Sequence, residues 1–220
     1  EMCIRDRRIA YRENSSWDAF KIAMDANPTT PLFDPENPNL YSDFTGQEAL
    51  WNPVEELKLE QNGGETKLLD WDATVKLNLL PLLAKDGHSI HSLSTQLTFA
   101  DQQSDNFDYW FRPSTSRLAM KNDYKGEASR TYSKYRQHSL EWLGNYAMEL
   151  KGHRARAMVG YSYQYFQNSG LNAANKDFSS DGLLYNNLGS GEWAKEEGRN
   201  EMGTNKSDSK LIAFLSLIHI

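Results

Sequence analysis

The chain has 220 residues, a formal net charge of −6 and a mean hydropathy of −0.72. The acidic balance provides no basic surface for nucleic acid. No run of about 18 apolar residues is present, so the sequence excludes a transmembrane helix. This absence does not exclude membrane-crossing strands, because their apolar residues alternate with polar ones and form no long apolar run. Cys3 is the single cysteine, which excludes an internal disulfide and a thiol metal cluster.

The two ends of the chain depart from the pattern beside them. Residues 1–7 read EMCIRDR and residues 215–220 read LSLIHI, and both resemble translated sequencing-adapter fragments. We therefore expect both to be non-native, with residues 8–214 as the natural segment. On this expectation the natural segment lacks both of its own termini, which accounts for the missing signal peptide. The alternative for residues 211–220 is one apolar strand.

Residues 12–66 hold most of the prolines and are predicted to be mainly irregular. Within them, residues 17–26 have the apolar spacing of a helix, which Asn27 and Pro28 end. So long a connection is uncommon in a compact domain unless it is functional. The external loops of outer-membrane barrels reach such lengths.

Residues 67–80 alternate more cleanly than any other stretch and are predicted to form a strand. A turn at residues 81–87 leads to a returning strand at residues 88–102. Residues 103–126 are predicted to be a polar loop around an aromatic cluster. That cluster consists of Phe107, Tyr109, Trp110 and Phe111.

A hairpin over residues 127–166 has the clearest pairing, with its turn at Lys151 and Gly152. Folding the two arms about that turn fixes the partner of each residue. The apolar face pairs Met148 with Ala155, Tyr146 with Ala157, Gly144 with Val159, Trp142 with Tyr161, and Leu140 with Tyr163. The other face pairs Glu149 with Arg154, Ala147 with Arg156, Asn145 with Met158, Glu141 with Ser162, and Ser139 with Gln164. One dry and one wet face are typical of outer-membrane strands.

After this hairpin, residues 167–209 are predicted to be a long loop and residues 210–214 a final strand. The connections therefore alternate between long and short along the chain. Strands that run up and down a barrel have short turns on one side and long loops on the other. The sequence thus predicts an all-β fold, an antiparallel up-and-down transmembrane β-barrel segment with long extracellular loops.

The alternation assigns side chains to two faces. The predicted lipid-facing residues are Leu69, Trp71, Val75, Leu77, Trp142, Tyr146, Val159, Tyr161 and Tyr163. The predicted lumen-facing residues are Asp70, Asp72, Lys76, Glu141, Glu149, Arg154 and Arg156. The aromatics near the long loops are expected to form an interfacial girdle. Glu149 and Arg154 are expected to form a cross-strand pair.

Side chains suited to chemistry are sparse. His88 and His91 would lie on opposite faces of a strand, and the Asp-rich stretches lack the spacing of a calcium loop. No nucleophile–base pair or phosphate-binding loop is present. The sequence predicts no catalytic residue, no metal ligand and no cofactor. The candidate ligand or partner contacts are loop aromatics, with packing against one another as the alternative: Tyr109, Trp110, Phe111, Tyr185 and Trp193.

Several stretches together resemble the SusC/RagA family of TonB-linked outer-membrane transporters. Residues 26–34 (ANPTTPLFD) are similar to that family's "NPT-P-D" loop, and residues 160–164 (GYSYQ) to one of its strands. The other matching stretches are residues 51–54, 177–181, 185–189 and 209–214. Their order and spacing carry the resemblance over residues 8–214. The chain departs from the family's usual aromatic, Gly and Arg at Leu215, in keeping with a non-native tail.

The resemblance implies an outer-membrane transporter of a Gram-negative bacterium, with an N-terminal plug and a large barrel. Such a protein imports oligosaccharides or peptides with energy delivered by TonB, and a SusD-like surface lipoprotein covers its external face. The plug and the TonB-contacting segment are not in this sequence. The alternative is a secreted or surface β-sandwich that binds glycans, in which a second sheet would cover the same apolar residues.

Overall fold

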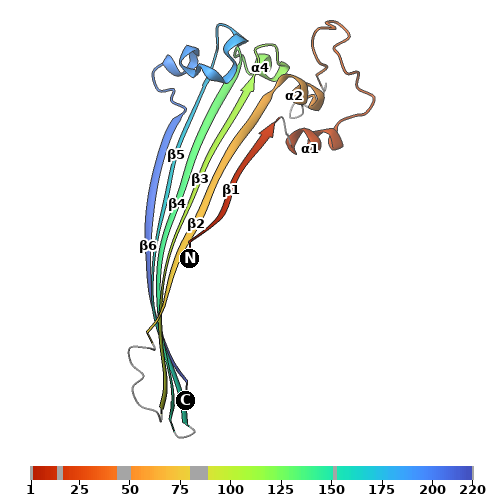
Figure 1. The fold of residues 1–220 in the computed structure, drawn as a ribbon. Coiled ribbons are helices and arrows are strands. Elements are labelled where there is room, and N and C mark those ends of the chain that lie inside the picture. Colours follow the sequence, from red (N-terminus) through yellow and green to blue (C-terminus); the bar gives the residue numbers. More distant parts are fainter. Residues whose placement is uncertain (1, 14–16, 44–50, 80–88, 151–152, 220) are drawn as a thin grey trace.

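The computed structural model describes residues 2–13, 17–43, 51–79, 89–150 and 153–219. Six strands form one antiparallel sheet in chain order (Figure 1). The strands are β1 (Met2–Glu13), β2 (Gln61–Asn78), β3 (Ser89–Arg112), β4 (Glu127–Leu150), β5 (His153–Lys176) and β6 (Met202–His219). The sheet is all-β and runs up and down, as the alternation predicts.

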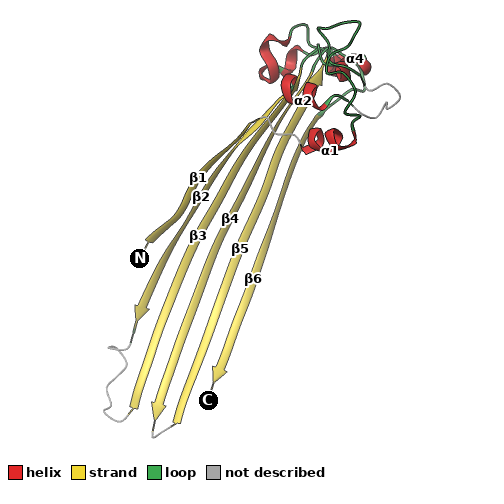
Figure 2. Ribbon diagram, turned by 90° about the vertical axis from the view of Figure 1, so that its right-hand side faces the viewer, coloured by secondary structure: helices red, strands yellow, loops and turns green. Residues whose placement is uncertain are grey.

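The helices gather with the loops at one end of this sheet (Figure 2). They are α1 (Trp17–Asp25), α2 (Pro53–Leu59), α4 (Arg117–Lys121) and the 3-10 turns η1 (Asp181–Asn186), η2 (Leu188–Ser190) and η3 (Trp193–Lys195). None of the helices in the described ranges has the length and apolarity that a membrane span requires. We call the end that holds the helices the loop end.

The predicted register of the β4–β5 hairpin is confirmed. Each of the ten predicted pairs is a Cα pair of the sheet, from Glu149 with Arg154 to Leu140 with Tyr163. The predicted β2–β3 pairing holds as well, with Val75 opposite Leu97. The turns expected at residues 81–87 and at Lys151 and Gly152 lie outside the described residues.

The strands extend farther toward the loop end than the sequence predicts. Residues 103–112 belong to β3 and residues 167–176 to β5, and the loop prediction for both stretches is wrong. Likewise β6 begins at Met202 and β2 at Gln61. Backbone hydrogen bonds to the neighbouring strand continue beyond the apolar stretch, where both faces are mostly polar. The alternation that signals a strand in sequence is therefore missing there.

The first connection contains more helix than predicted. The expected helix is present as α1, and α2 follows in a stretch predicted to be irregular. Asn52 caps α2, because its side chain accepts hydrogen bonds from the amides of Val54 and Glu55, and Pro53 fits the first helical turn.

The chain ends take part in the sheet. Residues 2–7 lie in β1 and pair with β2, and residues 215–219 lie in β6 and pair with β5. Backbone hydrogen bonds between strands can form with many different side chains, so this pairing does not test whether these residues are native. Their non-native origin stays a prediction.

Hydrophobic burial is confined to the loop end. Phe111, Ala128 and Phe178 form a small cluster, against which Leu184, Tyr185 and Leu188 pack. Along the rest of its length the described sheet is a single layer. Its apolar side chains therefore face outward instead of filling a core.

Candidate functional site

One face of the sheet carries a continuous apolar band. We call it the outer face; it holds Val75, Leu97, Trp142, Tyr161 and Phe214, which are successive cross-strand partners. The next row toward the loop end is Ala73, Phe99, Leu140, Tyr163 and Ile212. From Phe99 to His91 the band spans nine residues of β3, and the eight rises between them amount to about 26 Å.

Side chains of this band are exposed. Val75 is 55% exposed, Leu97 44% and Phe214 82%. The described residues form a single sheet, so none of them covers the band as the second sheet of a sandwich would. An apolar surface of this extent is a place where other apolar matter binds. The predicted lipid-facing residues all lie on this face.

The polar atoms of two aromatic side chains in the band, Trp142 and Tyr146, have partners within the sheet. The indole Nε1 of Trp142 donates to Thr95 Oγ1 at 2.8 Å, and Tyr146 Oη lies 2.7 Å from His91 Nδ1. The rings of Trp71 and Phe99 pack at 5.4 Å. The band therefore presents ring surface to its surroundings without unpaired donors from Trp142 and Tyr146.

The opposite face, which we call the inner face, is mostly polar on β2–β5. It carries all seven predicted lumen-facing residues. The hydroxyl oxygens of Thr74 and Thr98 lie 3.1 Å apart on it. The predicted cross-strand ion pair is confirmed, with Arg154 Nε 3.2 Å from Glu149 Oε2. Strand β6 is the exception, because Leu211, Leu215 and Leu217 lie on this face.

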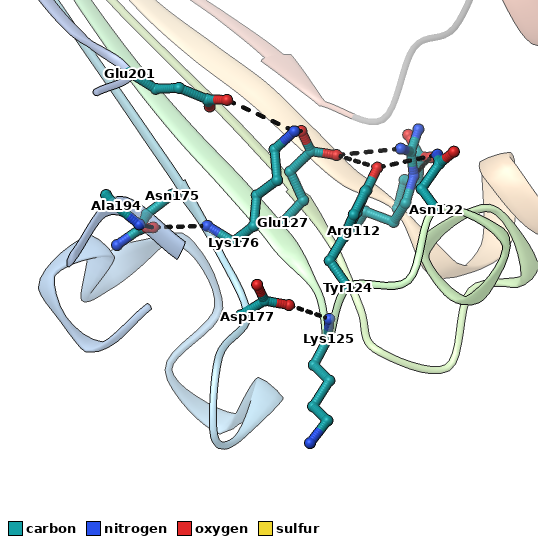
Figure 3. A network of polar contacts seen from close by, with 11 residues as sticks. Arg112, Asn122, Tyr124, Lys125, Glu127, Asn175, Lys176, Asp177, Ala194 and Glu201 are labelled. Atoms are coloured by element: carbon teal, nitrogen blue, oxygen red, sulfur yellow. Dashed lines mark hydrogen bonds and ion pairs between the residues drawn. The ribbon is translucent and has the colours of Figure 1, made fainter. Parts of the chain in front are cut away.

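A network of charges joins four strands at the loop end of the inner face (Figure 3). Arg112 Nε lies 2.6 Å from Glu60 Oε1, and its Nη1 lies 3.3 Å from Glu127 Oε2. Lys176 Nζ lies 3.2 Å from Glu127 and 3.6 Å from Glu201. The side chains of Arg112 and Glu60 are only 12% and 6% exposed. The network fastens the start of β2 to β3, β4, β5 and the approach to β6.

Burial shapes the titration of this network. It raises the pKa of the Glu60 carboxyl, although Arg112 and Trp110 partly offset the shift through charge and hydrogen bonds. Burial lowers the pKa of Lys176, but the carboxylates of Glu127 and Glu201 outweigh it and hold that pKa above its ordinary value. Lys176 therefore stays charged and holds its two acidic partners together.

The segment between β5 and β6 is fastened by side chains at its base. Asn175 Nδ2 donates to the carbonyls of Leu188 and Gly191, and its Oδ1 accepts from the amide of Ala194. The amide of Lys125 donates to Asp177 Oδ1 at 2.8 Å. This loop is thus built on the sheet instead of extending freely from it.

The predicted aromatic contacts divide into two groups. Tyr109, Trp110 and Phe111 lie in β3 and not in a loop, which corrects their predicted position. Phe111 is 2% exposed, so it belongs to the core cluster and is no ligand contact. Tyr185 and Trp193 do lie in the last connection, in η1 and η3.

These aromatics pack against the protein itself. The rings of Tyr109 and Tyr185 stack with centroids 3.9 Å apart. Trp110 donates to Glu60 and lies under the Arg112 guanidinium, and Trp193 lies 5.3 Å from Lys176 Nζ. Gly63 makes room for Tyr109, because a Cβ there would lie 2.5 Å from its hydroxyl. Each has a structural role, which favours self-packing over ligand binding.

A second cluster fastens Asp34, Tyr41 and Glu55 to Arg117 at the start of α4. Arg117 pairs with Asp34, its Nε donates to the carbonyl of Tyr41 at 3.1 Å, and its amide donates to Glu55 Oε1. Glu55 is 4% exposed, and its burial raises the pKa of the carboxyl. The native state therefore binds more protons than the unfolded chain, so burying the ionised carboxylate lowers stability above its ordinary pKa of 4.5.

We expect this cluster to become more stable as the pH falls through the raised pKa of Glu55 toward its ordinary value of 4.5, because the cost of burying the ionised carboxylate is lost there. Hydrogen exchange at the Arg117 amide, corrected for the intrinsic rate at each pH, measures this. E55Q keeps the acceptor for that amide and removes the charge, so its protection is expected to vary less with pH. The same pH dependence in E55Q would show that another group is responsible.

Sequence reasoning does not find the residues that hold the loop end together, namely Glu60, Arg112, Lys176 and Glu55. They come from distant parts of the chain, and no local spacing links them. Within the described ranges, no group of three or more His, Cys, Asp or Glu side chains is placed to hold a metal ion.

Comparisons with known proteins bear on the fold. No family model matches the chain, and no curated protein sequence does. A chain in the structure of the RagAB peptide transporter has a similar fold, with a TM-score of 0.53 and 14% sequence identity. The match covers 82% of this chain and 18% of that one. The present chain therefore spans less than a fifth of that neighbour, and the likeness supports a common fold.

Proposed function

We propose that this chain is part of the barrel wall of an outer-membrane transporter of the SusC/RagA type, in a Gram-negative bacterium. The observation that carries the proposal is the exposed apolar band, which continues over five strands and has a polar face behind it. Lipid is the apolar matter that such a band on a single curved sheet fits. The likeness to a chain of the RagAB peptide transporter supports it.

The complete protein would import a substrate too large for a simple pore, either an oligosaccharide or a peptide. We further propose that it works with a SusD-like surface lipoprotein on the loop end and with TonB through segments outside this sequence. The structural neighbour is a peptide transporter, which favours peptide as the cargo. We assign no catalytic role and no cofactor to this part of the protein.

Adjacent residues on opposite faces provide the test. Gln96 lies on the inner face and Leu97 on the outer face of β3. In a cysteine-free version of the complete protein, we expect a water-soluble maleimide to label Q96C in isolated outer membranes and to leave L97C unlabelled. A lipid-soluble maleimide is expected to label L97C.

Denaturation in detergent is the control for this experiment, because both cysteines should then react equally. Equal labelling of Q96C and L97C by the water-soluble reagent in intact membranes would contradict lipid contact. A soluble β-sandwich would leave Q96C reactive and L97C unlabelled by both reagents, because a second sheet would cover Leu97.

A further inference from the structure

A group of cations lies on the outer face just beyond the apolar band, on its loop-end side. We call it the basic margin; it consists of Lys134 and Arg136 on β4 and Lys206 and Lys210 on β6. The register places Lys134, Ser169 and Lys206 in one row, and His138, Tyr165 and Lys210 in another. Strand spacing and rise put the four cations within an area on the order of 10 Å by 13 Å.

Most of this charge is not neutralised by the protein. Lys134 pairs with Asp105 at 3.4 Å, and His138 with Asp101 at 2.5 Å. Among the described residues no ion pair involves Arg136, Lys206 or Lys210. Asp208, between the two lysines of β6, is the one carboxylate on the outer face of β4–β6 in these described rows. Over β3–β6 the same three rows hold these four cations and three carboxylates, Asp101, Asp105 and Asp208, so the local balance is positive in a chain with a net charge of −6.

Arg136 adds an independent sign of a missing partner. Its Nε is shielded from solvent and has no hydrogen-bond partner in the described part of the chain. A buried donor without an acceptor is costly, and native structures leave few of them. Its direct neighbours across the sheet, Gln103 and Gln167, are neutral, and the diagonal carboxylates Asp105 and Asp101 pair with Lys134 and His138. An external anion would satisfy both its charge and its donor.

The opposite margin of the band has a different composition. On β3–β5 the outer-face row at that margin is His91, Met148 and Ala155, which contains no lysine or arginine. Tyr163 and Tyr165 lie beside the basic margin, where rings suit a membrane interface. In the described outer-face rows of β3–β6, the lysines and arginines beside the band therefore lie on its loop-end side.

We propose that the basic margin binds the phosphate groups of a phosphorylated glycolipid in the outer leaflet. This inference rests on the proposed function, since the band must contact lipid for the margin to meet headgroups. Guanidinium and ammonium groups on a rigid sheet suit phosphate oxygens. The apolar rows that begin at Tyr163 and Ile212 would contact the acyl chains of the same lipid.

The test measures binding of lipid A to the detergent-purified complete protein, by displacement of a fluorescent lipid A. Diphosphorylated lipid A is compared with the same lipid after removal of both phosphates. Each cation near a headgroup contributes roughly a five-fold change in affinity, so R136Q/K206Q/K210Q is expected to lose on the order of 100-fold for the phosphorylated lipid. The dephosphorylated lipid is expected to bind all variants alike.

A matched control removes three cations from the inner face, in K76Q/R154Q/R156Q. This variant is expected to keep the preference for phosphorylated lipid. A wild-type protein that binds both lipids equally, or a control variant that loses as much as the outer-face variant, would overturn the proposal. Displacement of the lipid by millimolar inorganic phosphate alone would also overturn it, since that would indicate a site for free phosphate.

Failure of this inference can be separated from failure of the proposed function. Fractionation and heat-modifiable migration on gels report whether the protein is assembled in the outer membrane. Absence of assembly contradicts the proposed function itself. Normal assembly with no preference for phosphorylated lipid contradicts only the role of the basic margin.

Discussion

Arginine at Val75 is expected to prevent assembly of the complete protein in the outer membrane. Val75 lies within the apolar band, about 7 Å from its middle row along the strand, and is 55% exposed. An arginine near the membrane midplane on a lipid-facing strand costs about 2–4 kcal/mol. The level of folded, heat-modifiable protein in the outer-membrane fraction measures the effect, and we expect a large loss.

T74R is the matched control, because Thr74 precedes Val75 on the same strand and lies on the inner face beside Thr98. The natural Lys76 on that face already carries a charge at this depth. We therefore expect T74R to assemble at close to the normal level. Equal loss in both variants would mean that assembly depends on the size of the side chain introduced in β2 and not on lipid contact.

Replacing Arg112 by methionine is expected to loosen the loop end. Methionine has a similar length but leaves Glu60 and Glu127 without their shared cation. Removing one partner from a mostly buried ion pair costs about 3–5 kcal/mol, and the lower part of that range applies because the carboxylates keep some solvent contact. Hydrogen exchange over α2 and the loop ends of β3 and β4 measures the free energy of local opening.

Two further variants define the cause of this effect. R112M/E60Q is expected to be less destabilised than R112M, because glutamine removes the stranded charge and still accepts from Trp110. R199Q removes an exposed arginine that pairs with Glu196 at 3.0 Å, and exposed pairs contribute about 0–1 kcal/mol. A loss in R199Q as large as in R112M would rule out burial as the reason.

The sequence predicts well the part of the sheet that carries the apolar band. On β4 and β5 the alternation and the short connection together set the partners of Trp142, Gly144 and Tyr146. A slip by one residue would reverse the two faces, so a clean pattern leaves one register. The returning strand predicted at residues 88–102 is also present, within β3, where Leu97 lies opposite Val75.

The loop end cannot be predicted in the same way. Residues 103–112 and 167–176 are strands with polar residues on both faces over much of their length, and their sequence resembles a loop. This is why the sequence places Tyr109, Trp110 and Phe111 in a loop. The network of Glu60, Arg112, Glu127 and Lys176 forms where the ends of four strands meet. The spacing of residues within any one segment of the sequence does not indicate this meeting.

The length of the strands has a consequence for how the protein meets its surroundings. From Asp101 to Arg112, β3 continues for on the order of 35 Å beyond the apolar band. If the apolar band contacts lipid, this extension places the loop end above the lipid headgroups. Under the proposed function, cargo or a partner protein would therefore first contact the loop end at a distance from the lipid surface, and the charge network would hold the strand ends together there.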